Sequence, residues 1–62
     1  MASDLLKYFV YAHLPSHLQD VSKPFSDLAN LIEDELPNGP EKTVALRKLL
    51  ESKDCAVRAA LN

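Results

Sequence analysis

Residues 41–61, EKTVALRKLLESKDCAVRAAL, carry an unbroken helical pattern that contains neither glycine nor proline. Alanine, leucine, arginine, lysine and glutamate predominate, and all of them favour helices. At about 100° per residue, the apolar side chains fall on one broad face, which comprises Leu46, Leu49, Leu50, Ala56, Val57, Ala60 and Leu61. Lys53 falls in the middle of this face, so its ammonium must either reach water or find an anionic partner.

The same helix has two further strips. One carries Arg47, Glu51, Asp54 and Arg58, whose spacing allows weak i,i+4 ion pairs between the first two and between the last two. The other strip is thin and apolar, and it holds Val44, Cys55 and Ala59. A helix with apolar side chains on several sides needs cover on more than one side.

Two shorter helical segments precede it. We expect a first helix over residues 3–13, capped by Ser3 and stopped before Pro15. Its two faces carry Leu5, Leu6, Phe9, Val10 and His13 on one side and Lys7, Tyr8 and Tyr11 on the other.

A second helix is predicted over residues 22–36. Ser22 is a suitable N-cap and Pro24 is tolerated in a first turn. An earlier start at Ser16 stays open, although Pro24 would then kink the helix. Its apolar face holds Phe25, Leu28, Ala29, Ile32 and Leu36, and its acidic, solvated face holds Ser26, Asp27, Asn30, Glu33 and Asp34.

Residues 36–40, LPNGP, predict a tight turn between the second and third helices. The fold class expected is therefore all-α: a short N-terminal helix followed by an antiparallel αα-hairpin. Residues 1–62 are expected to form one domain.

The length of the chain predicts self-association. A chain of 62 residues buries a small core and is marginally stable alone. Disulfides within the chain cannot add stability because Cys55 is its only cysteine. We therefore expect a homo-oligomer. The free thiol and the lack of a signal peptide, a membrane-spanning run or a lipidation motif favour the cytoplasm.

Composition argues against several functions. The net charge is −2 and the basic residues are scattered, so we expect no duplex nucleic acid partner. No catalytic motif is present, and neither a cofactor nor a metal is expected. His13 and His17 have the i,i+4 spacing of metal ligands, but Pro15 lies between them and no third ligand is near.

Several residues are candidates for ligand contacts. Tyr8 and Tyr11 beside Lys7 are either surface aromatics or a platform on which a nucleobase stacks near a cation. A helix that begins at Ser22 would offer free N–H groups next to Lys23, which suits a phosphate, although an ordinary N-cap explains the same pattern.

The third helix supplies the other cations. Intrahelical ion pairs are the simpler explanation for Arg47 and Arg58. They do not explain Lys53, which lies within the apolar face.

The segments YAHLPSHLQDVSKPF, LP and PEKTVALRKLLESKDCAVRA resemble the small helical-hairpin proteins of phages that act as anti-CBASS cyclic-oligonucleotide sponges. The resemblance runs from Phe9 to Ala60. It implies oligomers, typically hexamers, that bind cyclic dinucleotides and trinucleotides between protomers without cleaving them. Sequestration then blocks the nucleotide-activated antiphage defence of the host.

The resemblance also assigns residues. Tyr11 and Lys23 match the positions that contact the cyclic dinucleotide, with Tyr8 as the alternative tyrosine. His13 and Arg58 are nominated for a trinucleotide pocket. Our leading hypothesis is therefore a non-enzymatic sponge. The alternatives are a small protein-interaction or structural module that binds no nucleotide, and an enzyme that degrades the same nucleotides.

Overall fold

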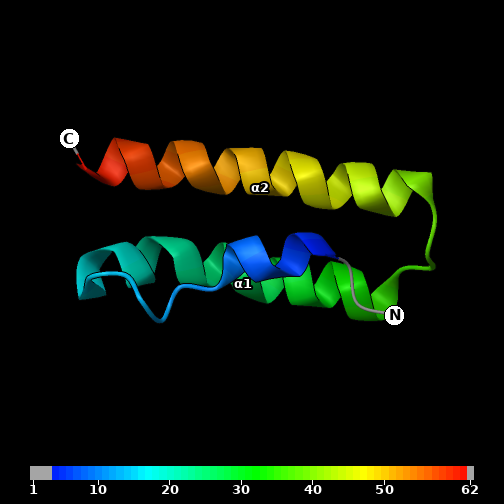
Figure 1. Ribbon diagram of the computed structural model, residues 1–62, viewed down its shortest axis with the longest axis horizontal. Coiled ribbons are helices and arrows are strands. Elements are labelled where there is room, and N and C mark those ends of the chain that lie inside the picture. The colour runs from blue at the N-terminus through cyan, green and yellow to red at the C-terminus, as the bar shows by residue number, and fades with distance from the viewer. Residues whose placement is uncertain (1–3, 62) are drawn as a thin grey trace.

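The computed structural model describes residues 4–61 (Figure 1). They form a 3-10 helix, η1 (Asp4–Phe9), and two α-helices, α1 (Ser16–Glu35) and α2 (Pro40–Leu61). No β-strand occurs within this range, so the prediction of an all-α fold is confirmed. No helix in this part of the chain is both long enough and apolar enough to cross a membrane.

The three elements pack into an elongated body of 36 × 18 × 15 Å. Figure 1 shows α1 and α2 side by side, with the chain reversing direction between them. η1 contacts both of these helices, so it lies over the groove between them.

The core sits where the three elements meet. Phe9 from η1, Ala29 from α1 and Leu46 from α2 are almost completely buried and contact one another. Half-buried apolar side chains surround them, namely Leu5, Leu6, Phe25, Ile32, Leu49 and Leu50. Phe9 therefore fixes the N-terminal segment against the other two helices.

The first helix differs from the prediction of residues 3–13. The proposed cap, Ser3, lies outside the described residues, and the helical segment is a 3-10 helix that ends at Phe9. The chain then turns, with the Leu14 N–H donating to the Tyr11 carbonyl at 3.0 Å. Gln19 Nε2 donates to the Leu14 carbonyl at 2.7 Å and holds this turn against α1. Pro15 restricts only Leu14, the residue before it, so it does not account for an end at Phe9.

The second helix starts at Ser16, so the preferred start at Ser22 is wrong. Pro15 occupies the N-cap position, and its carbonyl accepts hydrogen bonds from the N–H groups of Leu18 and Gln19 at 2.9 and 3.0 Å. Pro24 consequently lies inside the helix. The early start places Leu18 against the rest of the protein, where it is only 6% exposed.

Lys42 joins the end of α1 to the start of α2. Its Nζ donates to the Glu33 carbonyl at 2.8 Å, the Leu36 carbonyl at 3.1 Å and Asn38 Oδ1 at 3.0 Å. Glu33 Oε1 lies 3.5 Å from the same nitrogen. A cation at this point satisfies carbonyls at the C-terminus of α1 and complements the negative end of its dipole.

This arrangement corrects the predicted solvated face of the second helix. The Glu33 side chain is only 11% exposed and Ser26 is buried, because residues from outside α1 cover them. The remaining members of the predicted face, Asp27, Asn30 and Asp34, are exposed as expected.

α2 extends over the predicted range and begins one residue earlier, at Pro40. Its apolar face is buried at Leu46 and half-buried at Val57, but Leu61 is 63% exposed. The two predicted i,i+4 ion pairs of this helix do not form. Instead, Lys53 pairs with Asp54 at 3.0 Å, and Arg58 Nη2 donates to Cys55 Sγ at 3.2 Å.

Candidate functional site

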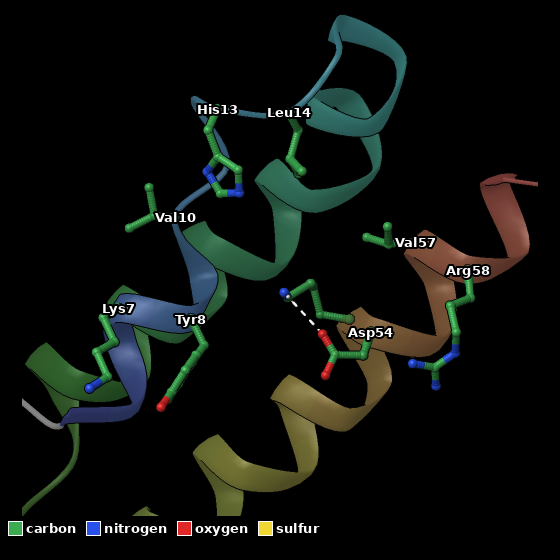
Figure 2. A pocket seen from close by; sticks show the side chains of 9 residues that line it. Lys7, Tyr8, Val10, His13, Leu14, Asp54, Val57 and Arg58 are labelled. Atoms are coloured by element: carbon green, nitrogen blue, oxygen red, sulfur yellow. Dashed lines mark ion pairs between the residues drawn. The ribbon is translucent and has the colours of Figure 1, made fainter.

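A pocket of about 350 Å³ lies between the N-terminal segment and the second half of α2 (Figure 2). η1 and the turn after it supply one wall, because η1 ends at Phe9 and the chain then turns, with the Leu14 N–H donating to the Tyr11 carbonyl. α2 supplies the other wall, since Phe9 holds η1 close to it. The lining consists of Lys7, Tyr8, Val10, His13, Leu14, Lys53, Asp54, Val57 and Arg58.

The polar lining is mainly cationic. Lys7, Lys53 and Arg58 carry positive charge, and Asp54 is the one carboxylate in the lining. Lys53 Nζ lies 3.0 Å from Asp54 Oδ1, the contact drawn as a dashed line in Figure 2. Lys7 and Arg58 make no ion pair within residues 4–61, so they give the pocket positive charge that an anionic ligand could neutralise.

Tyr8 provides the aromatic surface of the pocket. Its side chain is 51% exposed, and Lys7 Nζ lies 5.2 Å from the centroid of its ring. A cation over one part of an aromatic surface leaves an arrangement suited to a base with a phosphate nearby. The sequence had left the roles of these two residues open, and the structure places them together at the pocket.

Lys53 has a half-buried side chain that is 14% exposed. The sequence left open whether its ammonium reaches water or finds an anionic partner. In the structure it pairs with the neighbouring Asp54. Because the pair also lines the pocket, the Lys53 ammonium is both charge-compensated and within the site.

Tyr11 and Lys23 do not line this pocket. Lys23 lies in the middle of α1, where backbone N–H groups are used within the helix, so the predicted phosphate site at a helix N-terminus is wrong. Its Nζ instead pairs with Asp27 Oδ2 at 3.1 Å, with both side chains well exposed.

The pKa of Lys23 is raised above its ordinary value of 10.5. The hydrogen bond to Asp27 is the main cause, followed by attraction to the Asp27 charge and a smaller contribution from Tyr11. Because the pKa is raised on folding, the pair stabilises the fold at neutral pH, and this stabilisation is lost as the pH rises through the raised value.

Arg47 is exposed on α2 outside the pocket, and it makes no ion pair with any residue of the described chain. His13 lines the pocket, whereas His17 does not. No group of three His, Cys, Asp or Glu side chains within residues 4–61 is arranged to hold a metal ion.

The structure therefore brings together four of the seven predicted ligand-binding residues, namely Tyr8, His13, Lys53 and Arg58. The sequence had not indicated the apolar lining formed by Val10 and Leu14, because the chain leaves the helical pattern there. A helical wheel treats each segment alone, so it could not show that η1 and the end of α2 form two walls of one pocket.

No family model, curated protein or solved structure matches this chain. The case for a function therefore rests on the pocket itself, which is lined by three cations, one exposed aromatic ring and apolar side chains. These groups suit an organic anion that carries a planar ring.

Proposed function

We propose that this protein is a non-enzymatic sponge that binds cyclic dinucleotides or trinucleotides and keeps them from the nucleotide-activated immune effectors of a host. The proposal includes assembly of antiparallel hairpins into a homo-oligomer, with a hexamer favoured by the resemblance of the sequence. The observation that carries it is the pocket in which Tyr8 lies near Lys7 and which Arg58 of α2 also lines.

The chemistry of the lining fits such a ligand. A phosphate would accept charge-assisted hydrogen bonds from Arg58 and Lys7. A base would stack on Tyr8 and contact apolar side chains such as Val57. The acidic net charge of the chain does not oppose binding, because the charges within the pocket govern the local potential.

The size of the pocket favours contributions from more than one chain. A volume of about 350 Å³ is at the lower end of the range for ligand sites, roughly 300–1,000 Å³. A cyclic dinucleotide carries two bases and two phosphates. Two copies of the pocket related by symmetry would supply two matched sets of contacts to it.

Calorimetric titration with a panel of cyclic dinucleotides and trinucleotides tests the proposal. We expect binding of at least one member. The variants R58A and Y8A should each weaken it about tenfold or more, since each contact is worth roughly 1–3 kcal/mol. L61A is the control, because Leu61 is an exposed side chain of α2 outside the pocket. If no member binds at micromolar concentration, the proposal is wrong.

Tyr11 and Lys23 form a second candidate contact set on the strength of the sequence resemblance. If they contact the dinucleotide, K23A should weaken its binding about tenfold while leaving the trinucleotide unaffected. D27N, which removes the ion-pair partner of Lys23, separates a direct contact from an effect of the ion pair. Equal affinities for wild type and K23A would remove this second set from the proposal.

The enzymatic alternative makes a different prediction for the bound molecule. His13 is the one imidazole of the pocket, and Asp54, its one carboxylate, is paired with Lys53. For a sponge, the nucleotide released by heating the complex should be recovered intact by mass spectrometry. Recovery of a linear or hydrolysed product would favour the enzyme instead.

A protein-interaction module is the second candidate function, and exposed leucines favour it. Leu28 and Leu31 are 45% and 56% exposed on α1. A pull-down that yields one stoichiometric protein, together with no response to any nucleotide, would support this function over the sponge.

A further inference from the structure

α1 carries a second apolar strip that is largely exposed among the described residues. Val21, Pro24, Leu28 and Leu31 recur at intervals of three and four residues, so they share one side of the helix. Val21 is half-buried, whereas both leucines are about half exposed. Such spacing is typical of a helix that packs against a further helix.

Acidic side chains border this strip. Asp20, Asp27 and Asp34 follow one another at intervals of seven residues and are all exposed. Asp27 is paired with Lys23, while Asp20 and Asp34 have no ion-pair partner within residues 4–61. Two α1 strips facing each other would therefore bring rows of carboxylates together, which is unfavourable.

The outer side of α2 has complementary properties. Val44, Cys55 and Ala59 are small or medium-sized apolar residues, and all three are exposed. Arg47 and Lys48 flank them as exposed cations. Glu41 and Glu51 are also exposed on this side, so the strip carries two cations and two carboxylates.

The two helices also differ in overall charge. α1 contains five carboxylates and one lysine, whereas α2 contains five cations and three carboxylates. Lys42, Lys53 and Arg58 lie away from the outer side of α2, so the α2 strip has no excess of cations. The chain thus presents an acidic strip with large leucines on α1 and a less acidic strip with small side chains on α2. Leucines pack closely only where the facing surface has room for them.

We propose that the outer strip of α1 packs against the outer strip of α2 in a second copy of this chain. Leu28 and Leu31 fill the gaps between the small side chains of the partner copy, and the aspartates of α1 face the cations of its α2. The inference identifies the contact within the homo-oligomer of the proposed function, and its tests need no nucleotide. Failure of assembly and failure of nucleotide binding are therefore seen separately.

The first test is the mass of the purified protein by light scattering. Wild type should show a multiple of the 6.9 kDa chain mass, and L28D/L31D should be a helical monomer by circular dichroism. L61D is the matched control, because Leu61 is an exposed leucine outside the strip, and its mass should equal that of wild type. A monomeric wild type, or an unchanged mass for L28D/L31D, would overturn the proposal.

The second test is a pair of charge reversals, which identifies the helices that meet. D20K/D34K places lysines opposite cations, and R47E/K48E places glutamates opposite aspartates, so each variant alone should lose assembly. An equimolar mixture restores opposite charges across the contact and should recover the wild-type mass.

The charge reversals can also contradict the proposed contact between α1 and α2. If α1 packed against α1, D20K/D34K would replace one like-charged contact by another and keep its mass. Unchanged assembly of that variant, or a mixture of the two variants that stays monomeric, would show that α1 does not meet α2 of the second copy.

Discussion

Lys42 and Ser22 are both buried polar residues, but only Lys42 has partners for its polar group. Lys42 is 7% exposed and donates three hydrogen bonds around the end of α1. The hydroxyl of Ser22 is fully buried and has no hydrogen-bond partner in the structure. Burial of Lys42 therefore stabilises the fold through its contacts, whereas burial of the Ser22 hydroxyl destabilises it, because an unpaired buried polar group costs free energy.

We predict that K42M lowers the free energy of unfolding by about 3 kcal/mol, because the variant leaves the largely buried Glu33 carboxylate without its cation. Methionine retains most of the aliphatic stem, so the loss measures the ammonium. Chemical denaturation of K42M beside K48M checks this. The exposed Lys48 should contribute less than about 0.5 kcal/mol, and equal losses for the two variants would contradict the role of Lys42.

S22A should leave the free energy of unfolding unchanged or raise it by about 1 kcal/mol, since it removes an unpaired hydroxyl. The predicted N-cap role has the opposite sign, because loss of an N-cap serine costs about 1 kcal/mol. Urea denaturation of this single variant therefore distinguishes an internal Ser22 from a capping one.

At the scale of the elements, Pro24 lowers the stability of α1, because it lies inside the helix. A proline in a helix interior lacks an N–H, so it cannot make the hydrogen bond that its position offers, and its ring crowds the preceding turn. We predict that P24A raises the free energy of unfolding by about 1–3 kcal/mol.

P40A is the matched control for this prediction. Pro40 is the first residue of α2, where a helix tolerates proline, so its replacement should change stability by less than about 1 kcal/mol. Denaturation of both variants at one protein concentration makes the comparison. A destabilised P24A would show that the proline is needed at its place in α1.

The sequence predicted the elements with the most regular patterns. The α2 pattern extends over more than five turns without glycine or proline, and the structure reproduces it almost residue for residue. The start of α1 was predicted wrongly because Ser22 and Pro24 imitate a helix start. In the structure the helix runs from Ser16 through both residues, and Leu18, which precedes them, is buried.

The candidate site was predicted only in part, because the sequence indicated single residues but not how the segments meet. Residue types indicated Tyr8, His13, Lys53 and Arg58 one at a time, and the structure places them in one pocket. Their meeting depends on the turn that follows Phe9, which fixes where the N-terminal segment crosses the other helices. Turns of this kind carry no helical periodicity from which they could be predicted.

At the scale of the whole molecule, the surface of the chain exceeds what one hairpin covers. Seven large apolar residues of the described chain are more than about a third exposed, and Leu28, Leu31 and Val44 belong to the two strips proposed to meet. If assembly buries them, folding and association are linked, because only the folded chain presents both strips.

We therefore predict that the thermal midpoint of the wild-type protein rises with protein concentration, as it does for linked folding and assembly. The monomeric L28D/L31D variant should unfold at the same temperature at every concentration. Scanning calorimetry over a dilution series measures both. A midpoint independent of concentration for wild type would indicate that the single chain is stable without partners.

The contacts of Lys42 also have a consequence for engineering. The bend between α1 and α2 contributes the Leu36 carbonyl and Asn38 Oδ1, and both accept hydrogen bonds from Lys42 Nζ. These contacts fix the length of the bend. Loop tips usually accept inserted tags and are usually cut first by proteases. We expect this bend to resist proteolysis and to tolerate insertions poorly. A reporter peptide inserted there would break the contacts of Lys42 and destabilise the hairpin.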